Sequence, residues 1–173
     1  MRQAQGYTLL ELMVVLVVIG IMTALIVPEL RGAYRSAVLE SSAREVLWAL
    51  RLAHSQAVTT GRSVRFRWDA RAHRYLLEVE PPESSSRAPK DAPVAFLPLE
   101  NVPGAAGRLD PEVSIEVRSV MEDDARVGPA GVEFHADGTA DAAELHLTGA
   151  GGAHVTLAVT PSTARVAERR GAK

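Results

Sequence analysis

The stretch that decides the fold is GYTLLELMVVLVVIGIMTALIVPEL, residues 6–30. From Leu12 to Val27 it holds sixteen consecutive residues without a charge, and adding residues 7–11 extends the run to 21 with one carboxylate. A helix of 21 residues is about 31 Å long, close to the thickness of a bilayer core. Its side chains are apolar on every face, so the pattern predicts a lipid-facing helix over residues 7–28.

Three ordinary interpretations of this stretch compete. A secretory signal peptide would have an apolar core of roughly 7–15 residues and a small-x-small cleavage site. Here the run is longer, and Pro28-Glu29-Leu30-Arg31 follows it. A buried core helix would show a polar face, which is missing over four turns. A plain membrane anchor fits the length but leaves the carboxylate of Glu11 unexplained.

Glu11 is the feature that a plain anchor does not require. A carboxylate at the bilayer centre costs roughly 2.5–3.5 kcal/mol on insertion scales, so it indicates a function and a partner. If the chain were cut between Gly6 and Tyr7, the new α-amine would lie four residues before Glu11. An amine and a carboxylate of neighbouring chains would then neutralise each other in a low-dielectric setting. Position alone leaves open the alternative that Glu11 lies at headgroup depth without a role.

The segment Gly6-Tyr7-Thr8-Leu9-Leu10-Glu11-Leu12, followed by the apolar run and Pro28, resembles the N-terminal signal of type IV pilins and type II secretion pseudopilins. The resemblance implies that residues 1–6 are a leader and that a prepilin peptidase cuts after Gly6. It also implies that the same enzyme N-methylates Tyr7 and that Glu11 serves filament assembly. One departure is Tyr7, because the family usually has Phe at that position.

Beyond the apolar run the pattern changes. Pro28 cannot donate a hydrogen bond to the carbonyl of Ala24, which predicts a kink in the helix. Residues 29–60 then show the 3- and 4-residue spacing of an amphipathic helix that Gly61 ends. The apolar positions are Leu39, Ala43, Val46, Leu47, Leu50, Ala53 and Ala57. Trp48 lies off this stripe, which leaves contact with a sheet or with a partner open.

Residues 61–173 predict a β-rich domain. Alternating apolar residues indicate strands at 64–68, 75–79, 113–117, 132–134, 145–147 and 155–159, with a short strand near Val94–Leu97. Residues 81–111 hold seven of the ten prolines and predict a long loop, and Asp137-Gly138 is a strong turn signal. The residues from about Glu168 onward are polar and predict a frayed end.

This layout resembles the pilin fold, an α+β fold with a long N-terminal helix packed on an antiparallel sheet. The segments at residues 43–58 and 132–139 are similar to the GspH/FimT group. In that group a Thr-Gly-Arg-Val stretch often follows the last strand, and here Thr163-Ala164-Arg165-Val166 takes its place. The resemblance implies a minor pseudopilin H of a type II secretion system.

The sequence offers little for catalysis or metal binding. It contains no cysteine, and its net charge of −2 gives no global basic field. None of the five histidines has a zinc spacing, and His146 and His154 are interpreted as surface or cross-strand side chains. Asp137 and Asp141 lack the dense oxygen spacing of a calcium loop. We therefore expect no enzyme activity, no cofactor and no metal.

The resulting hypothesis is a structural subunit. Its partners would be other pseudopilins, the prepilin peptidase and the inner membrane, with secreted substrates as further candidates and no nucleic acid expected. It would cross the inner membrane once, with the C-terminal domain in the periplasm, and then enter the pseudopilus.

Two alternatives stay open. A FimT-like minor pilin of a type IV pilus would contact DNA through the Arg-rich hairpin formed by Arg65, Arg67, Arg71 and Arg74. A bitopic protein with a ligand-binding or catalytic β domain would keep an uncut N-terminus.

Overall fold

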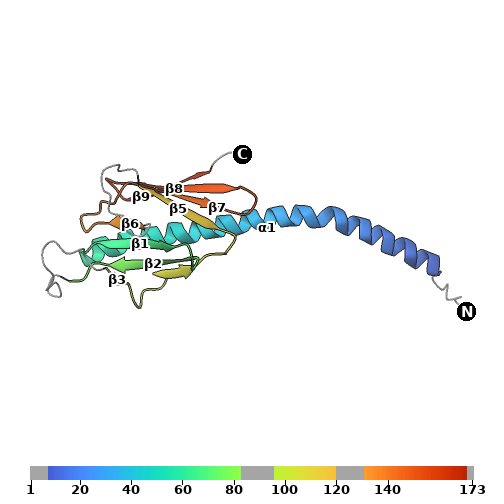
Figure 1. Cartoon of the computed structure of the whole chain (residues 1–173), viewed down its shortest axis with the longest axis horizontal. Coiled ribbons are helices and arrows are strands. Elements are labelled where there is room, and N and C mark those ends of the chain that lie inside the picture. Colours follow the sequence, from blue (N-terminus) through green and yellow to red (C-terminus); the bar gives the residue numbers. More distant parts are fainter. Residues whose placement is uncertain (1–7, 83–95, 120–130, 171–173) are drawn as a thin grey trace, which may run out of the picture.

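The computed structural model describes residues 8–82, 96–119 and 131–170, with the backbone alone for residues 25–31, 119 and 170. Within these ranges one long helix is followed by nine strands in two antiparallel sheets (Figure 1). The predicted α+β class, with a long N-terminal helix packed on antiparallel sheets, is confirmed.

The helix α1 spans Leu9–Thr60, 52 residues in a single element. It ends where the sequence predicted, because Gly61 takes the left-handed conformation with φ 64° that glycine adopts without steric cost. The C-terminal half of α1 lies along the β domain, whereas the N-terminal half extends away from it and curves (Figure 1). The helix therefore has one half inside the domain and one half outside it.

The first sheet contains five strands. Its order is β3-β2-β1-β6, and β4 also pairs with β2, so β3 and β4 share one edge of β2. The strands are β1 (Val64–Asp69), β2 (Arg74–Val79), β3 (Leu97–Pro98), β4 (Ala106–Arg108) and β6 (Gly131–Phe134). The second sheet has the order β5-β7-β8-β9, with β5 (Ser114–Ser119), β7 (Ala143–Thr148), β8 (His154–Thr160) and β9 (Arg165–Arg170).

The alternation read from the sequence sets which side chains enter the core. Phe66 of β1 pairs with Leu77 of β2, and both are fully buried. The Phe66 ring also stacks on Tyr75, with 5.7 Å between ring centroids. Aromatic pairs of this kind add about 0.5–1.5 kcal/mol beyond their burial. The β1–β2 hairpin thus forms part of the surface on which the helix packs.

The helix contributes the other wall of the core. Its buried apolar residues are Leu39, Ala43, Val46, Ala49, Leu50, Ala53 and Ala57. Val46 and Leu50 are completely buried, and the buried alanines on the same side let the backbone approach the sheets closely. Near the point where α1 leaves the domain, Gly149 lies so close to Leu39 that an added Cβ would be only 3.2 Å from it. The predicted amphipathic segment 29–60 thus supplies the helical side of the core.

A polar contact fixes the helix to the outer part of the first sheet. The Tyr75 hydroxyl donates a hydrogen bond of 3.2 Å to Glu45 of α1, and Gly107 of β4 lies directly against both groups. Burial and the neighbouring Glu45 carboxylate raise the pKa of Tyr75 to about 12. No side chain larger than hydrogen fits at position 107 without displacing this pair.

Three strands differ from the sequence-based expectation. The prediction of a frayed end from Glu168 is wrong, because β9 pairs with β8 from Arg165 to Arg170. Its residues are largely polar, but the free edge of β8 satisfies their backbone groups whatever the side chains are. The short strand β4 was also not predicted. Of the strand expected near residues 94–97, only Leu97 lies in a described strand, β3.

Candidate assembly surfaces

In the N-terminal half of α1, the apolar side chains that the structure describes are largely exposed. Its large apolar side chains are between 46% and 78% exposed, and they are Leu9, Leu10, Leu12, Met13, Val14, Val15, Leu16, Val17, Val18, Ile19, Ile21 and Met22. Exposed apolar surface on this scale marks a surface that another protein or a membrane covers.

Across the described residues, no helix combines the length and the hydropathy that crossing a bilayer requires.

Thr8 and Glu11 form the start of this half of α1. Thr8 is the N-cap, and its hydroxyl accepts a hydrogen bond of 3.2 Å from the Glu11 amide. Glu11 lies three residues after the cap, which is the position of the acidic residue in a capping box. Its negative charge also suits the N-terminus of a helix dipole. The capping role of Thr8 was not predicted, although the Thr-x-x-Glu spacing from Thr8 to Glu11 indicates it.

The other predicted N-terminal positions are described less fully. Gly6 and Tyr7, the predicted cleavage and methylation residues, lie outside the described residues. At Pro28 the backbone is helical, and α1 continues through it without interruption. The kink at Pro28 stays a prediction, and so do the functional boundaries at 6/7 and 28/29.

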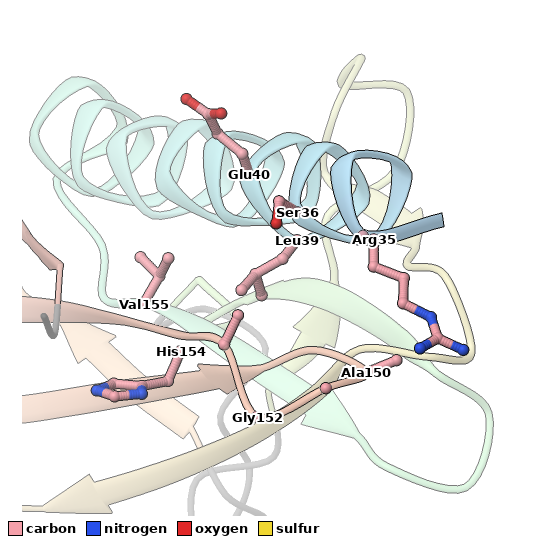
Figure 2. Close-up of a pocket in the computed structure, with 11 residues that line it drawn as sticks. Arg35, Ser36, Leu39, Glu40, Ala150, Gly152, His154 and Val155 are labelled. Carbon is pink, nitrogen blue, oxygen red and sulfur yellow. The ribbon is translucent and has the colours of Figure 1, made fainter. Parts of the chain in front are cut away.

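A small recess lies where α1 leaves the domain, between the helix and the β7–β8 turn (Figure 2). Leu39 and Val155 form its apolar interior, while the Arg35 side chain extends toward Ala150 at its mouth. Arg35 is only loosely held, because its Nε lies 3.9 Å from the Glu112 carboxylate and both side chains are half exposed. Glu40 and His154 also line the recess.

The Arg-rich hairpin is partly neutralised. Arg67 donates a 2.9 Å charged hydrogen bond to Glu78, and Arg65 lies 4.0 Å from the same carboxylate. Glu78 is only 6% exposed, and a carboxylate buried to this extent has to be paired with basic side chains. Phe96 covers Arg65, with its ring centroid 3.7 Å from the guanidinium carbon. Two of the four arginines are thus committed within the chain, which weakens the DNA-binding alternative.

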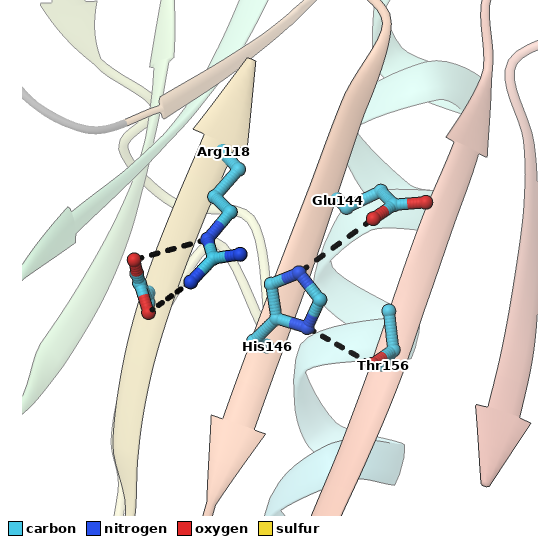
Figure 3. A network of polar contacts seen from close by, with 5 residues as sticks. Arg118, Glu144, His146 and Thr156 are labelled. Carbon is cyan, nitrogen blue, oxygen red and sulfur yellow. Dashed lines mark hydrogen bonds and ion pairs between the residues drawn. The ribbon is translucent and has the colours of Figure 1, made fainter. Parts of the chain in front are cut away.

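The outer face of the second sheet carries a polar network (Figure 3). Arg118 binds Glu116 through two hydrogen bonds of 3.0 and 3.2 Å, which lower the pKa of Glu116. The His146 ring is 3.0 Å from the Thr156 hydroxyl and 3.6 Å from the Glu144 carboxylate. In the β7–β8 register His146 faces Thr156, and His154 faces Thr148, so the two histidines are not paired with each other.

The aspartates around the Gly138 turn serve the turn itself. Asp137 accepts hydrogen bonds from the amide and hydroxyl of Thr139, and these bonds lower its pKa. Asp141 lies 3.4 Å from His135, whose other ring nitrogen is 3.8 Å from Glu133. The His135 ring therefore separates the two carboxylates. In the described part of the chain, no group of three or more His, Cys, Asp or Glu residues is placed to hold a metal ion.

Two family models match the chain. The model of the prokaryotic N-terminal methylation motif matches residues 1–27, and the model of the type II transport protein GspH matches residues 42–164. No curated protein matches the sequence.

Solved structures share the fold. The crystal structure of the minor pseudopilin EpsH from the type II secretion system of Vibrio cholerae has a TM-score of 0.59 and 12% identity, with 79% of this chain and 96% of that chain covered. The solution structure of E. coli GspH has a TM-score of 0.55 and 20% identity, over 78% of this chain and 89% of that chain.

Proposed function

This chain belongs to the GspH family of type II transport proteins, and on that premise we propose that it is a minor pseudopilin. In this role it is a non-enzymatic subunit of a periplasmic filament that helps a type II secretion system export folded proteins. The observation that carries the proposal is the division of one helix into a half packed in a domain and an exposed apolar half. That exposed half belongs to the same stretch as the methylation motif.

Filament membership has a direct test. Pseudopilus filaments purified from cells that produce the chain should contain it, and a strain without the chain should export less of the secreted proteins. Supply of the chain in trans should restore export. Filaments that never contain the chain would contradict the proposal.

Processing of the N-terminus is the first step. The methylation motif supports cleavage between Gly6 and Tyr7 by a prepilin peptidase, followed by methylation of the Tyr7 amine. The intact mass of the protein from peptidase-containing cells should correspond to a chain that begins at a singly methylated Tyr7. A Gly6→Leu variant should retain residues 1–6. An uncut wild-type chain in peptidase-containing cells would instead favour the bitopic alternative.

Membrane insertion is the second step. Sixteen uncharged residues from Leu12 to Val27 support a single inner-membrane span, with the β domain in the periplasm. Protease added to spheroplasts should digest the C-terminal domain, whereas protease confined to the cytoplasmic side should not. Recovery of the full chain in the soluble fraction would contradict this topology.

Glu11 is proposed to pair with the N-terminal amine of a neighbouring subunit. Its place in the capping box allows the charge to be tested apart from the helix cap, because Gln satisfies the same box. Glu11→Gln and Glu11→Lys should both leave insertion intact and reduce incorporation into filaments. Thr8→Ala, which removes the capping hydroxyl and keeps the charge, is the matched control and should assemble. Normal assembly of the Glu11→Lys variant would exclude the pairing.

The FimT-like alternative makes a separate prediction. Salt-sensitive DNA binding by the chain would favour a pilus role, because phosphate contacts release counterions. We expect weak binding, since Arg65 and Arg67 already hold Glu78.

A further inference from the structure

The end of the β domain from which α1 emerges is the end that the proposed topology turns toward the membrane (Figure 1). It carries the recess between α1 and the β7–β8 turn, whose volume of about 450 Å³ is typical of a small-molecule site. Gly32, which lines the recess, is five residues beyond Val27, the last residue of the uncharged run. That spacing is about 7.5 Å along the helix, and the headgroup layer of a bilayer is roughly 5–7.5 Å thick. The recess therefore begins at the outer limit of the headgroup layer.

Arg35 supplies the charge at the mouth of the recess. Its side chain extends toward the β7–β8 turn, whereas the carboxylate of Glu40 and the ring of His154 point away from the recess (Figure 2). The contact of 3.9 Å between Arg35 and Glu112 is half exposed, and such pairs contribute little to stability. The guanidinium is therefore able to leave Glu112 for a phosphate group, to which its fork of donors is well matched.

The recess has a fixed shape before anything binds. Its turn is closed by a hydrogen bond of 2.9 Å from the Gly149 amide to the Ala153 carbonyl and by one of 3.2 Å from the Gly152 amide to the Gly149 carbonyl. Gly149 also packs tightly on Leu39, and both Leu39 and Val155 are buried. A preformed site loses little conformational freedom when a ligand enters it. The apolar interior and the basic mouth together suit a phosphate group that is joined to CH₂ groups.

The last strand adds positive charge to the same end of the domain. It places Arg170 opposite Val155, which lines the recess, and Arg169 next to it. Arg169 is exposed to solvent, and the acidic Glu168 follows one pair further from the recess. Basic residues close to an anionic bilayer surface are attracted to it. Charge complementarity therefore favours an anionic lipid over a zwitterionic one.

We propose that the recess binds the headgroup of an anionic phospholipid, with the phosphate against Arg35 and the neighbouring CH₂ groups over Leu39 and Val155. This inference rests on the membrane insertion in the proposed function. Helical side chains point back toward the N-terminus, and long basic side chains extend toward the lipid interface, so Arg35 is directed toward the phosphate layer. The bound lipid holds the β7–β8 turn against the bilayer and fixes the orientation of the β domain at its surface.

Photo-cross-linking locates the lipid. The full chain, with a photoreactive residue in place of Ala153, is inserted into phosphatidylglycerol nanodiscs, irradiated and analysed by mass spectrometry. A lipid adduct should form, because Ala153 is exposed and lines the recess. The control is the same photoreactive residue in place of Ser55, which is 28 residues beyond Val27, or about 42 Å along the helix, and should form none. Equal adducts at the two positions would overturn the proposal.

Three variants of the chain that carries the photoreactive residue at position 153 test the charge. Arg35→Gln should lower the adduct yield about fivefold, the effect expected of one basic residue at an anionic surface. Arg35→Lys keeps the charge and should retain most of the yield. Arg51→Gln is the matched control and should behave as wild type, because Arg51 is an exposed residue of the same helix about 24 Å beyond Arg35. Equal yields from Arg35→Gln and Arg51→Gln would contradict the proposal.

Two further probes identify the source of the phosphate. Phosphatidylcholine nanodiscs should give a lower adduct yield than phosphatidylglycerol nanodiscs, because the phosphatidylcholine headgroup has no net charge. Inorganic phosphate in solution should leave the yield unchanged. If it abolished the adduct, the recess would be a site for free anions and the lipid assignment would be wrong. An adduct to a second copy of the chain in place of lipid would also overturn the assignment.

The same experiment separates this proposal from the proposed function. A chain that does not insert into nanodiscs overturns the membrane topology on which the inference rests. An inserted chain without a lipid adduct at position 153 overturns only the headgroup site.

Discussion

The two halves of α1 are both rich in apolar residues, yet only one of them is buried. From Leu9 to Met22 the large apolar side chains are exposed on all sides, whereas Val46 and Leu50 in the second half are fully buried. The second half alternates apolar residues with charged ones such as Glu40 and Arg44, which form an i,i+4 ion pair. The difference shows that a helix packs on its own domain when an apolar stripe on one side is combined with a polar face on the other. A helix apolar on every face has to be covered by something outside the domain.

The largest expected difference is between two leucines of the same helix. Leu50→Ala should lower the free energy of unfolding of the β domain by about 2–5 kcal/mol, because it leaves a cavity in the core. Leu16→Ala in the apolar half should leave that free energy within about 0.5 kcal/mol of wild type, as surface changes do. Urea titration of both variants in the same detergent measures the contrast. Equal losses would mean that the apolar half also packs on the domain.

Glycine substitutions give the next contrast. Gly107→Ala should destabilise the domain by about 1–3 kcal/mol, because the new methyl group overlaps the Tyr75–Glu45 pair. Gly20→Ala is the matched control, since an added Cβ at position 20 meets no described atom within 4 Å. Thermal unfolding followed by near-UV circular dichroism compares the two. A Gly107→Ala domain that unfolds like the wild type would show that β4 moves away from the helix at little cost.

The contact between Tyr75 and Glu45 also predicts a pH dependence. The pKa of Tyr75 is raised from 10.0 to about 12 in the folded state, so the folded protein favours the neutral phenol. This contribution to stability is complete below pH 10.0 and is lost as the pH rises through about 12. Unfolding measured from pH 9 to pH 12 should show an alkaline loss that Tyr75→Phe reduces. An identical alkaline profile in that variant would exclude Tyr75 as the source.

The smallest effect is expected at Ala164, remote from both halves of the helix. Ala164 is buried and has φ 48°, a left-handed conformation that costs a non-glycine residue roughly 1–2 kcal/mol. Ala164→Gly removes this strain but also removes a buried methyl group and adds backbone entropy to the unfolded chain. We expect a net change of less than about 1 kcal/mol in chemical denaturation.

A β-branched residue at the same position is the counterpart. Ala164→Val should be clearly destabilising, because a β-branched residue tolerates this conformation poorly and the position is buried. If both variants behaved alike, the backbone at position 164 would not be under strain. An unstrained backbone at this position would also explain how Ala164 takes the place of the Gly that is often found there in the GspH/FimT group.

Most of the fold could be predicted from local patterns. The end of α1 at Gly61 follows from the conformational freedom of glycine, and the buried positions of β1 and β2 follow from the alternation around Phe66 and Leu77. The strand β9 could not be predicted, since its side chains are mostly polar and its backbone is held by the edge of β8. The sequence also left open what Trp48 contacts, because an exposed side chain does not take part in the apolar periodicity of the helix.

By itself, the sequence determined the long helix, the β-rich domain and the N-terminal motif with Gly6, Tyr7 and Glu11. Each of these rests on local chemistry: an uninterrupted apolar run, alternation along strands, and a short motif in register. Only the tertiary structure decided that Glu78 lies against both Arg65 and Arg67 and that Trp48 is exposed to solvent. Such facts depend on which elements pack together, and packing brings together residues that are far apart in the chain.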